Sequence, residues 1–394
     1  MPSTLRNCIM RAVCFVLSPL VLLACLTAVA PAAVEVGDMV AVTQETTIRG
    51  DGGATQQVVP GAVLLVERVD ANRIWVSGLV SGWIDATAVM ELDVAIKYFA
   101  DLAAKSPTDA APLRALGNVL RAHGNLEQGF DNLCRAERLA PNDVLTHRWR
   151  AMLILAAQFP NEAQADACAA ARLAPNDPAA LIDRAVVYYC LGQLDEALAD
   201  YNAALKLVPQ SAVAYLGRGD VKADRGDLPG AIADYAEALK LDPHDARALI
   251  GRADCYARQA REDLALADLE AAIKANPKSA RAWNRLARLE LSAANDKIRN
   301  PAKAIEHARK ACELSHWRWM EPAMTLAEAH AAAGDPSRAV EMRIAALRIG
   351  MAETSHIANW RLRAHFESCR MVRQDKDAEP APADDDFPRP AVTE

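Results

Sequence analysis

The sequence predicts a mainly α-helical protein, built as a solenoid of about seven helix pairs with a small β-barrel ahead of it. Two observations support this fold. In the middle of the chain, prolines recur with a period of 34 residues, and small residues recur at fixed distances from them. Between residues 34 and 90 the helical pattern is absent, and short β-type runs alternate with Gly, Asp and Asn.

Composition agrees with this fold class. Of the 394 residues, 52% are hydrophobic but only 5% are aromatic, so the core must be built mostly from Ala, Leu, Val and Ile. A net charge of −7 provides no basic surface for nucleic acid, and we expect no nucleic-acid partner. The cysteines include no CxxC pair, which argues against a zinc or redox site and indicates no disulfide framework.

The first element in the chain is a targeting segment, residues 1–33. Arg6 and Arg11 precede an apolar run over residues 12–30, and Ala30-Pro31-Ala32 provides small residues for cleavage. This order of features is typical of a secretory signal peptide. We therefore expect an exported protein of the periplasm or cell envelope.

Two alternatives for this segment stay open. The apolar run is close to the ~20 residues that a membrane span needs, so it could remain as an uncleaved anchor. The stretch Leu22-Leu23-Ala24-Cys25 resembles a bacterial lipobox, in which Cys25 would carry lipid. Both alternatives still place the bulk of the chain outside the cytoplasm.

The second element, residues 34–91, is rich in β-type segments. Its main runs are VGDMV at 36–40, VVPGAVLLVERV at 58–69, RIWVS at 73–77 and GWIDATAVM at 82–90. In these runs and in its aromatic positions the segment resembles a bacterial SH3-like domain. We expect its two tryptophans, Trp75 and Trp83, to fill the core of the small barrel. The resemblance leaves cell wall or peptide as ligands of this module open.

The third element, residues 92–373, contains the repeats. The periodic prolines are Pro107, Pro141, Pro175, Pro209, Pro243 and Pro277. Twelve residues before each lies a small residue, in the order Ala95, Gly129, Ala163, Ala197, Ala231 and Ala265. Two antiparallel helices approach closely only where side chains are small, so each unit is predicted to be a helix, a short turn and a second helix ended by proline.

A helix pair of this length and pattern resembles the tetratricopeptide repeat (TPR), most clearly over residues 178–209 and 212–243. The resemblance implies a right-handed solenoid. Residues 92–105 are expected to form a lone second helix at its start, and residues 355–371 a closing helix at its end. The segment NDKIRNP, residues 295–301, lengthens one turn near the C-terminal end of the array.

The last element, residues 374–394, is polar and rich in Pro and Asp. Few apolar residues and a high charge leave such a segment unable to form a core, so we predict a disordered acidic tail.

No catalytic constellation is present. HExxH, GxSxG and P-loop motifs are absent, and we predict no enzymatic activity, cofactor, metal site or small-molecule substrate. The stretch His316-Trp317-Arg318-Trp319 combines bases and aromatics that can stack on nucleic acid or sugars. We expect these tryptophans to pack beneath a degenerate repeat instead.

The TPR resemblance implies a partner-binding groove lined by the first helix of each repeat. Four positions of that helix, spaced 3, 4 and 3 residues apart, lie on one face. The residues selected there are Arg114, Asn118, Arg121, Arg148, Met152, Ile182, Tyr189, Leu216, Asp220, Ile250 and Asp254.

The predicted function is a non-enzymatic scaffold that binds protein or peptide partners in this groove. The alternative is an envelope-anchoring module, in which the SH3-like domain binds cell wall or peptide and the repeats act as a spacer.

Overall fold

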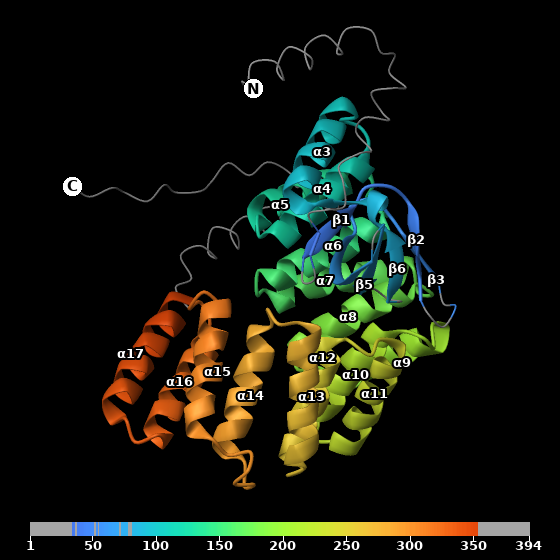
Figure 1. Ribbon diagram of the computed structural model, residues 1–394. Helices are drawn as coiled ribbons and strands as arrows, with labels where there is room; N and C mark the ends of the chain where they lie inside the picture. The colour runs from blue at the N-terminus through green and yellow to red at the C-terminus, as the bar shows by residue number, and fades with distance from the viewer. Residues whose placement is uncertain are drawn as a thin grey trace, which may run out of the picture. The chain divides into compact units, whose positions relative to one another are not determined.

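The computed structural model describes residues 34–35, 38–50, 53, 55–70, 72–77 and 81–353. A β-sheet precedes a row of helices, and the two form one compact unit as far as Gly350 (Figure 1). The predicted signal segment, closing helix and acidic tail lie outside the described residues. Within them, no helix is both long enough and apolar enough to cross a membrane.

The sheet contains seven antiparallel strands in the order β3-β2-β6-β5-β4-β1-β7. The strands are β1 (Met39–Val42), β2 (Thr46–Arg49), β3 (Thr55–Val58), β4 (Val63–Asp70), β5 (Arg73–Ser77), β6 (Gly82–Asp85) and β7 (Val89–Glu91), with a short 3-10 helix, η3 (Ala86–Ala88), before β7. One face buries Val40, Val66, Ile74 and Ile84 in a single cluster. Residues of helices α3–α17 do not join this cluster, so the sheet covers that face by curving over itself.

Fifteen helices follow in the described part of the chain. They are α3 (Leu92–Lys105), α4 (Ala110–His123), α5 (Leu126–Leu139), α6 (Val144–Ala156), α7 (Pro160–Leu173), α8 (Pro178–Cys190), α9 (Leu194–Leu207), α10 (Ala212–Asp224), α11 (Leu228–Leu241), α12 (Ala246–Arg258), α13 (Glu262–Ala275), α14 (Ala280–Ser292), α15 (Pro301–Leu314), α16 (Met320–Ala332) and α17 (Pro336–Glu353). The lone helix α3 and seven pairs agree with the number of helix pairs expected from the sequence. The turn between α14 and α15 is the lengthened one.

The proline period sets where the first helix of each pair begins. Two residues after each proline stands a capping residue whose side chain accepts a hydrogen bond from a backbone N–H of the first turn. These capping residues are Asp109, Asp143, Asp177, Ser211, Asp245 and Ser279. Proline therefore separates the end of one pair from the cap of the next.

Small residues allow the paired helices to touch, as the sequence pattern predicts. A Cβ atom on Gly117 of α4 would lie 2.6 Å from the Leu133 side chain and 2.9 Å from the carbonyl oxygen of Gly129, both on α5. Ala163 and Ala197, which take the place of Gly129 in the next pairs, have no exposed surface. The short turns inside four of the pairs use glycine with positive φ, for example Gly124 at 93° and Gly226 at 85°, whereas Gln158 and Ala260 take this conformation in two others.

Four consecutive pairs share an ion pair, buried on its aspartate side, that joins their two helices. An arginine of the first helix donates Nε and Nη2 to both oxygens of an aspartate on the second, at 2.5–2.8 Å. The pairs are Arg150–Asp166, Arg184–Asp200, Arg218–Asp234 and Arg252–Asp268. A two-pronged contact of this kind fixes the rotation of one helix against the other.

We predict that Asp234→Asn lowers the free energy of unfolding by about 3 kcal/mol, because it leaves the guanidinium of Arg218 without its charged partner. The control is Glu237→Gln on the same helix, whose ion pair with Lys240 is exposed. That change should stay within about 0.5 kcal/mol of the parent. Urea unfolding followed by helical circular dichroism compares them, and equal midpoints for the two variants would contradict a structural role for the repeated pair.

Candidate functional site

The sheet packs on the first helices of the solenoid. Ala41 of β1 lies in one buried cluster with Phe99 of α3 and Val119 of α4. Val63 and Met90, on neighbouring strands, add to the same cluster. This apolar contact joins the sheet to α3 and α4.

Two of the predicted groove residues are used in this contact. The Nδ2 atom of Asn118 donates to the carbonyl oxygen of Gly61 at 2.9 Å, and the Nε atom of Arg121 donates to Oδ1 of Asn118 at 2.9 Å. Asn118 is buried. At this end of the solenoid, the inner face therefore holds the chain's own sheet.

Gly61 allows the close approach. Its φ is +84°, and a Cβ atom there would lie 2.4 Å from Cα of Ala115 on α4. A side chain at this position would both strain the turn and push the sheet away from the helix.

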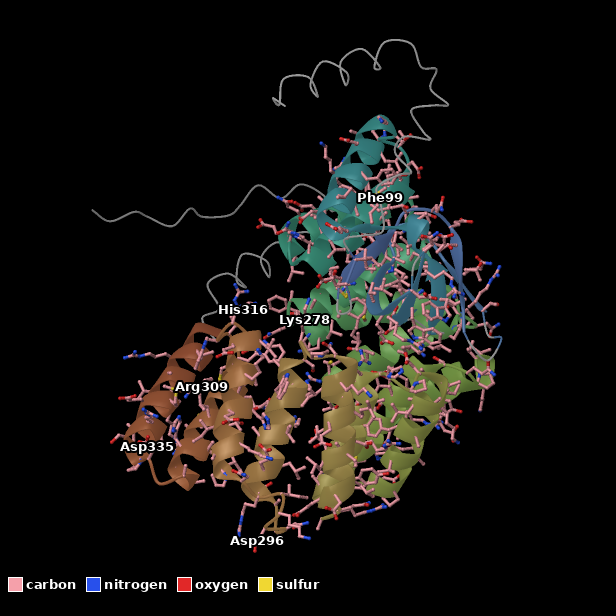
Figure 2. All side chains as sticks on the ribbon, viewed as in Figure 1. Phe99, Lys278, Asp296, Arg309, His316 and Asp335 are labelled. Carbon is pink, nitrogen blue, oxygen red and sulfur yellow. The ribbon has the colours of Figure 1, made fainter. Side chains whose placement is uncertain are left out.

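The sheet also reaches the distant α11–α12 turn. Trp75 has no exposed surface, and its Nε1 donates to Oδ2 of Asp242 at 3.3 Å. Its ring meets Trp83 edge-on at 5.5 Å, and the Arg68 guanidinium lies 4.0 Å from its centroid. The expectation that Trp75 fills the core of the barrel is wrong for this residue, because it points from the sheet towards the solenoid. A further ion pair joins Lys278 to Glu35 at 3.2 Å (Figure 2).

Other predicted groove residues serve the contact between neighbouring repeats. Arg114 of α4 pairs with Asp143, the cap of α6, at 2.8 Å. Arg148 of α6 pairs with Asp183 of α8 at 2.6 Å and with Asp177, the cap of α8, at 3.5 Å. The positive charges of both arginines are therefore largely balanced by aspartates of the solenoid itself.

The apolar members of the predicted set contribute mainly to packing. Ile182, Leu216 and Ile250 are all at least 94% buried, since their exposed fractions are 6%, 1% and 5%. Met152 is partly buried. The middle of the inner face is therefore less open than its sequence suggests.

A cavity of about 1090 Å³ remains where the sheet does not fill the inner face. Leu65, Glu67 and Ser77 of the sheet form one wall. The solenoid wall includes five of the predicted residues, Tyr189, Leu216, Asp220, Ile250 and Asp254, together with Arg247, Arg258, Arg281, Arg285 and Arg288. Part of the predicted set thus comes together around one space.

Most charged groups in the cavity wall already have partners. Tyr189 donates its hydroxyl to Asp224 at 2.5 Å, and Tyr235 donates to Asp220 at 2.7 Å. Arg285 donates to Asp254 at 2.9 Å. Burial raises the pKa of both Asp220 and Asp254, although these contacts act in the opposite direction.

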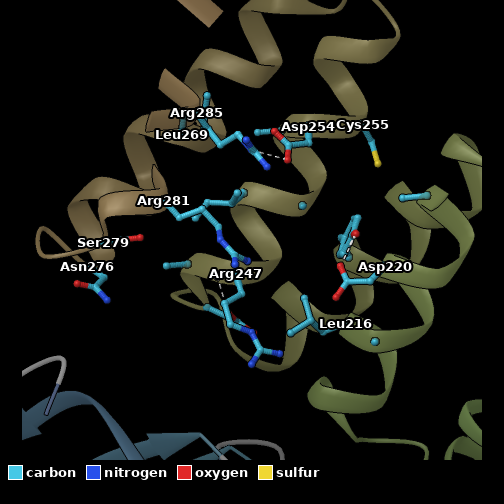
Figure 3. Close-up of a pocket in the computed structure, with 18 of the residues that line it drawn as sticks. Leu216, Asp220, Arg247, Asp254, Cys255, Leu269, Asn276, Ser279, Arg281 and Arg285 are labelled. Carbon is cyan, nitrogen blue, oxygen red and sulfur yellow. Dashed lines mark hydrogen bonds and ion pairs between the residues drawn. The ribbon is translucent and has the colours of Figure 1, made fainter. Parts of the chain in front are cut away.

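Arg247 and Arg281 differ from these groups. Both side chains are exposed, and no hydrogen bond or ion pair of either guanidinium is found within the described residues. Figure 3 shows both extending into the space between Asp220 and Ser279. The geometry can therefore bind a carboxylate or another anion.

Sequence reasoning missed Arg281 as a site residue, although a signal was present. Arg281 follows Arg247 by one period of 34 residues, and both are the second residue of their helix, α14 and α12. Equivalent positions in adjacent repeats lie side by side in a solenoid, so a repeated charge at one position marks the inner face.

The stretch His316–Trp319 forms the turn between α15 and α16. Trp317 and Trp319 are 41% and 48% exposed, and Trp319 reaches the rim of the cavity. The expectation that these tryptophans pack beneath a repeat is wrong. His316 and Trp317 have φ values of 50° and 55°, which place them in a left-handed turn instead of a helix.

Family comparison identifies the repeats. A TPR repeat model matches residues 187–224 and 219–259, and a tetratricopeptide repeat model matches residues 261–315. The chain therefore contains tetratricopeptide repeats. A comparison with curated proteins finds no match.

Solved structures share the solenoid fold. The Cut9–Hcn1 hetero-tetramer of the APC/C matches with a TM-score of 0.53 and 17% identity, over 61% of this chain and 46% of that one. The chain thus spans less than half the length of that relative. A tetratricopeptide repeat protein from Parabacteroides merdae matches with a TM-score of 0.50 and 19% identity, over 65% and 93%. The human IFIT1 dimer with PPP-AAAA matches with 0.50 and 14%, over 66% and 69%. At these identities the likeness concerns the fold.

We predict that Gly61→Ala destabilises the packing of the sheet on α4 by about 1–3 kcal/mol beyond the cost of backbone strain. The matched control is Gly53→Ala. Gly53 also has positive φ, at +81°, but a Cβ atom there meets nothing within 4 Å. The only expected cost in the control is therefore the backbone strain of about 1–2 kcal/mol. Thermal unfolding and the rate of protease cleavage within residues 34–91 compare the variants, and equal behaviour would contradict a tight contact at Gly61.

Proposed function

We propose that this protein is a non-enzymatic scaffold that binds peptide segments of partner proteins on the inner face of its TPR solenoid. The binding site is the cavity between the sheet and helices α8–α14. Its volume of about 1090 Å³ is slightly larger than the ~300–1,000 Å³ of typical small-ligand pockets, which leaves room for a few peptide residues.

The pair Arg247 and Arg281 is the observation that carries this proposal. Both guanidinium groups enter the cavity from equivalent repeat positions, and neither forms a hydrogen bond or an ion pair within the described residues, although both act electrostatically on the nearby Asp220. Two adjacent arginines bind carboxylates through paired N–H groups. The favoured partner is therefore a peptide with acidic side chains or a free C-terminal carboxylate, and Leu216 and Ile250 offer apolar contact beside it.

The proposal also includes the cellular location of the protein and the identity of its sheet. The features of residues 1–33 support export to the periplasm or cell envelope. The strand-rich segment 34–91 is proposed to be an SH3-like domain, supported by its sequence runs and by a sheet that curves over its own core.

The alternative function, anchoring to cell wall through this domain, has weaker support. An aromatic surface for sugars or peptides would need exposed rings. Trp75 is instead buried against the solenoid, where it is hydrogen-bonded to Asp242.

We predict that the double variant Arg247→Ala/Arg281→Ala loses at least tenfold in affinity for acidic peptides, because both anion-binding groups are removed. The measurement uses a random peptide library presented to the intact chain, followed by fluorescence anisotropy on the enriched sequences. Arg309→Ala, an exposed arginine of α15 that does not line the cavity, is the matched control and should bind like the parent (Figure 2). A library without enrichment, or enrichment that the double variant retains, would refute this binding site.

A further inference from the structure

The sheet is attached to the solenoid by an apolar contact at one end and by polar contacts farther along, among them the exposed ion pair of Glu35 with Lys278. At one end β7 continues into α3 without a linker, and an apolar cluster joins the sheet to α3 and α4. At the other end a small polar contact joins Trp75, Glu67 and Asp242 at the α11–α12 turn. The first contact is fit to act as a hinge, and the second can open without breaking it.

Glu67 is aimed at the solenoid by an irregularity in its strand. The pairing of β4 with β5 shifts between Val66 and Arg68, so Glu67 has no opposite residue. Such a bulge changes the direction of a side chain. The Glu67 Oε1 atom accepts a hydrogen bond from Ser77, whereas its buried Oε2 atom has no donor among the described residues.

The Glu67 side chain also interacts with a second buried carboxyl group, that of Asp242. Asp242 is 1% exposed and already accepts from Trp75 Nε1 and from the backbone N–H of His244. Two buried carboxyl groups in contact cannot both be ionised at low cost, and one proton between them supplies the missing donor. Burial first, and then the contact with Asp242, raise the pKa of Glu67 from 4.5 to about 9.

The other charged groups near Glu67 do not replace this proton. From α12, Asp245 adds a further negative charge, which acts in the same direction as Asp242. From β4, Arg68 lies over the ring of Trp75. Arg247 of α12 lines the same cavity, but it is not among the main groups that shift the pKa of Glu67. From β5, the Ser77 hydroxyl favours the ionised form, yet it is outweighed.

We propose that the sheet is a proton-dependent latch on the solenoid, in which a proton shared by Glu67 and Asp242 holds the sheet over the α11–α12 turn and its loss releases this edge. In the closed state the Glu67 hydroxyl donates to Asp242. When that proton leaves to solvent, two carboxylates face each other in a buried site and repel. Since Glu67 and Ser77 form one wall of the cavity, release of this edge widens the cavity for a larger partner.

The direction of the pH dependence follows from the raised pKa. Between pH 4.5 and about 9 the closed state holds a proton that the open state gives up. Closure is therefore fully favoured below pH 4.5, weakens as pH rises, and is weakest above about 9. Each pH unit inside this window changes the ratio of closed to open by up to about tenfold.

The test follows Trp75 in the intact chain labelled with 5-fluorotryptophan, without any peptide present. Fluorine resonances report whether each ring is buried, and Trp75→Phe assigns the signal of Trp75. We expect the ratio of buried to exposed Trp75 to fall at least about tenfold between pH 6 and pH 10. Trp149, which is buried inside the solenoid, should keep its signal.

Two variants test whether Glu67 causes the pH dependence of the Trp75 signal. Glu67→Gln keeps a neutral N–H donor for Asp242, so Trp75 should stay buried across the whole range. Glu45→Gln, an exposed acid of the same domain, should behave like the parent. The latch is overturned if Glu67→Gln titrates like the parent, if the parent signal is constant with pH, or if Trp149 becomes exposed together with Trp75. Because no partner is involved, these outcomes leave the proposed peptide binding to its own experiment.

Discussion

The repeated ion pair between the two helices of a unit constrains the surface that four consecutive units of the solenoid present. In four consecutive units an arginine of the first helix holds both oxygens of an aspartate on the second, for example Arg218 and Asp234. Such a contact has little rotational freedom, so the first helices show the same face in each unit. The inner surface can therefore carry a pattern over these four units, and Arg247 lies on the first helix of the last of them.

Two parts of the inner surface of this solenoid have different roles. Near α4 it receives the protein's own sheet, through Asn118 and the close approach of Gly61 to Ala115. Further along it leaves a cavity, where the sheet supplies one wall. A tethered domain has an effective concentration in the millimolar range, so a free partner displaces it only at considerable cost. Under the proposed function, partners of modest affinity are thereby directed to the cavity.

Much of the helical architecture could be predicted from the sequence, because each repeat is specified locally. Proline, a capping residue two positions later and small residues at the crossing are short-range signals, and they place α3 at Leu92–Lys105 in agreement with the structure. The buried ion pairs were also visible as Arg and Asp sixteen residues apart with the same period, a signal that the sequence analysis did not use.

The candidate site could be predicted only in part, since it depends on contacts between distant segments. Trp75 and Asp242 are 167 residues apart, and nothing near Trp75 in the sequence indicates that it leaves the core of the sheet. The periodic pattern of the first helices correctly predicted Leu216, Asp220 and Asp254 as residues that line the cavity. It could not reveal that the sheet covers Asn118.

The placement of acids at the far contact suggests why the sheet is not fixed more firmly. A lysine or an amide in place of Glu67 would satisfy Asp242 at every pH, and an apolar pair would avoid the burial of carboxyl groups altogether. The chain instead combines a permanent apolar attachment at α3 and α4 with a weak polar contact that needs a proton. An arrangement with one strong and one conditional attachment favours movement about the strong one. The cavity lies beside the conditional contact, which is where such a movement changes its size most.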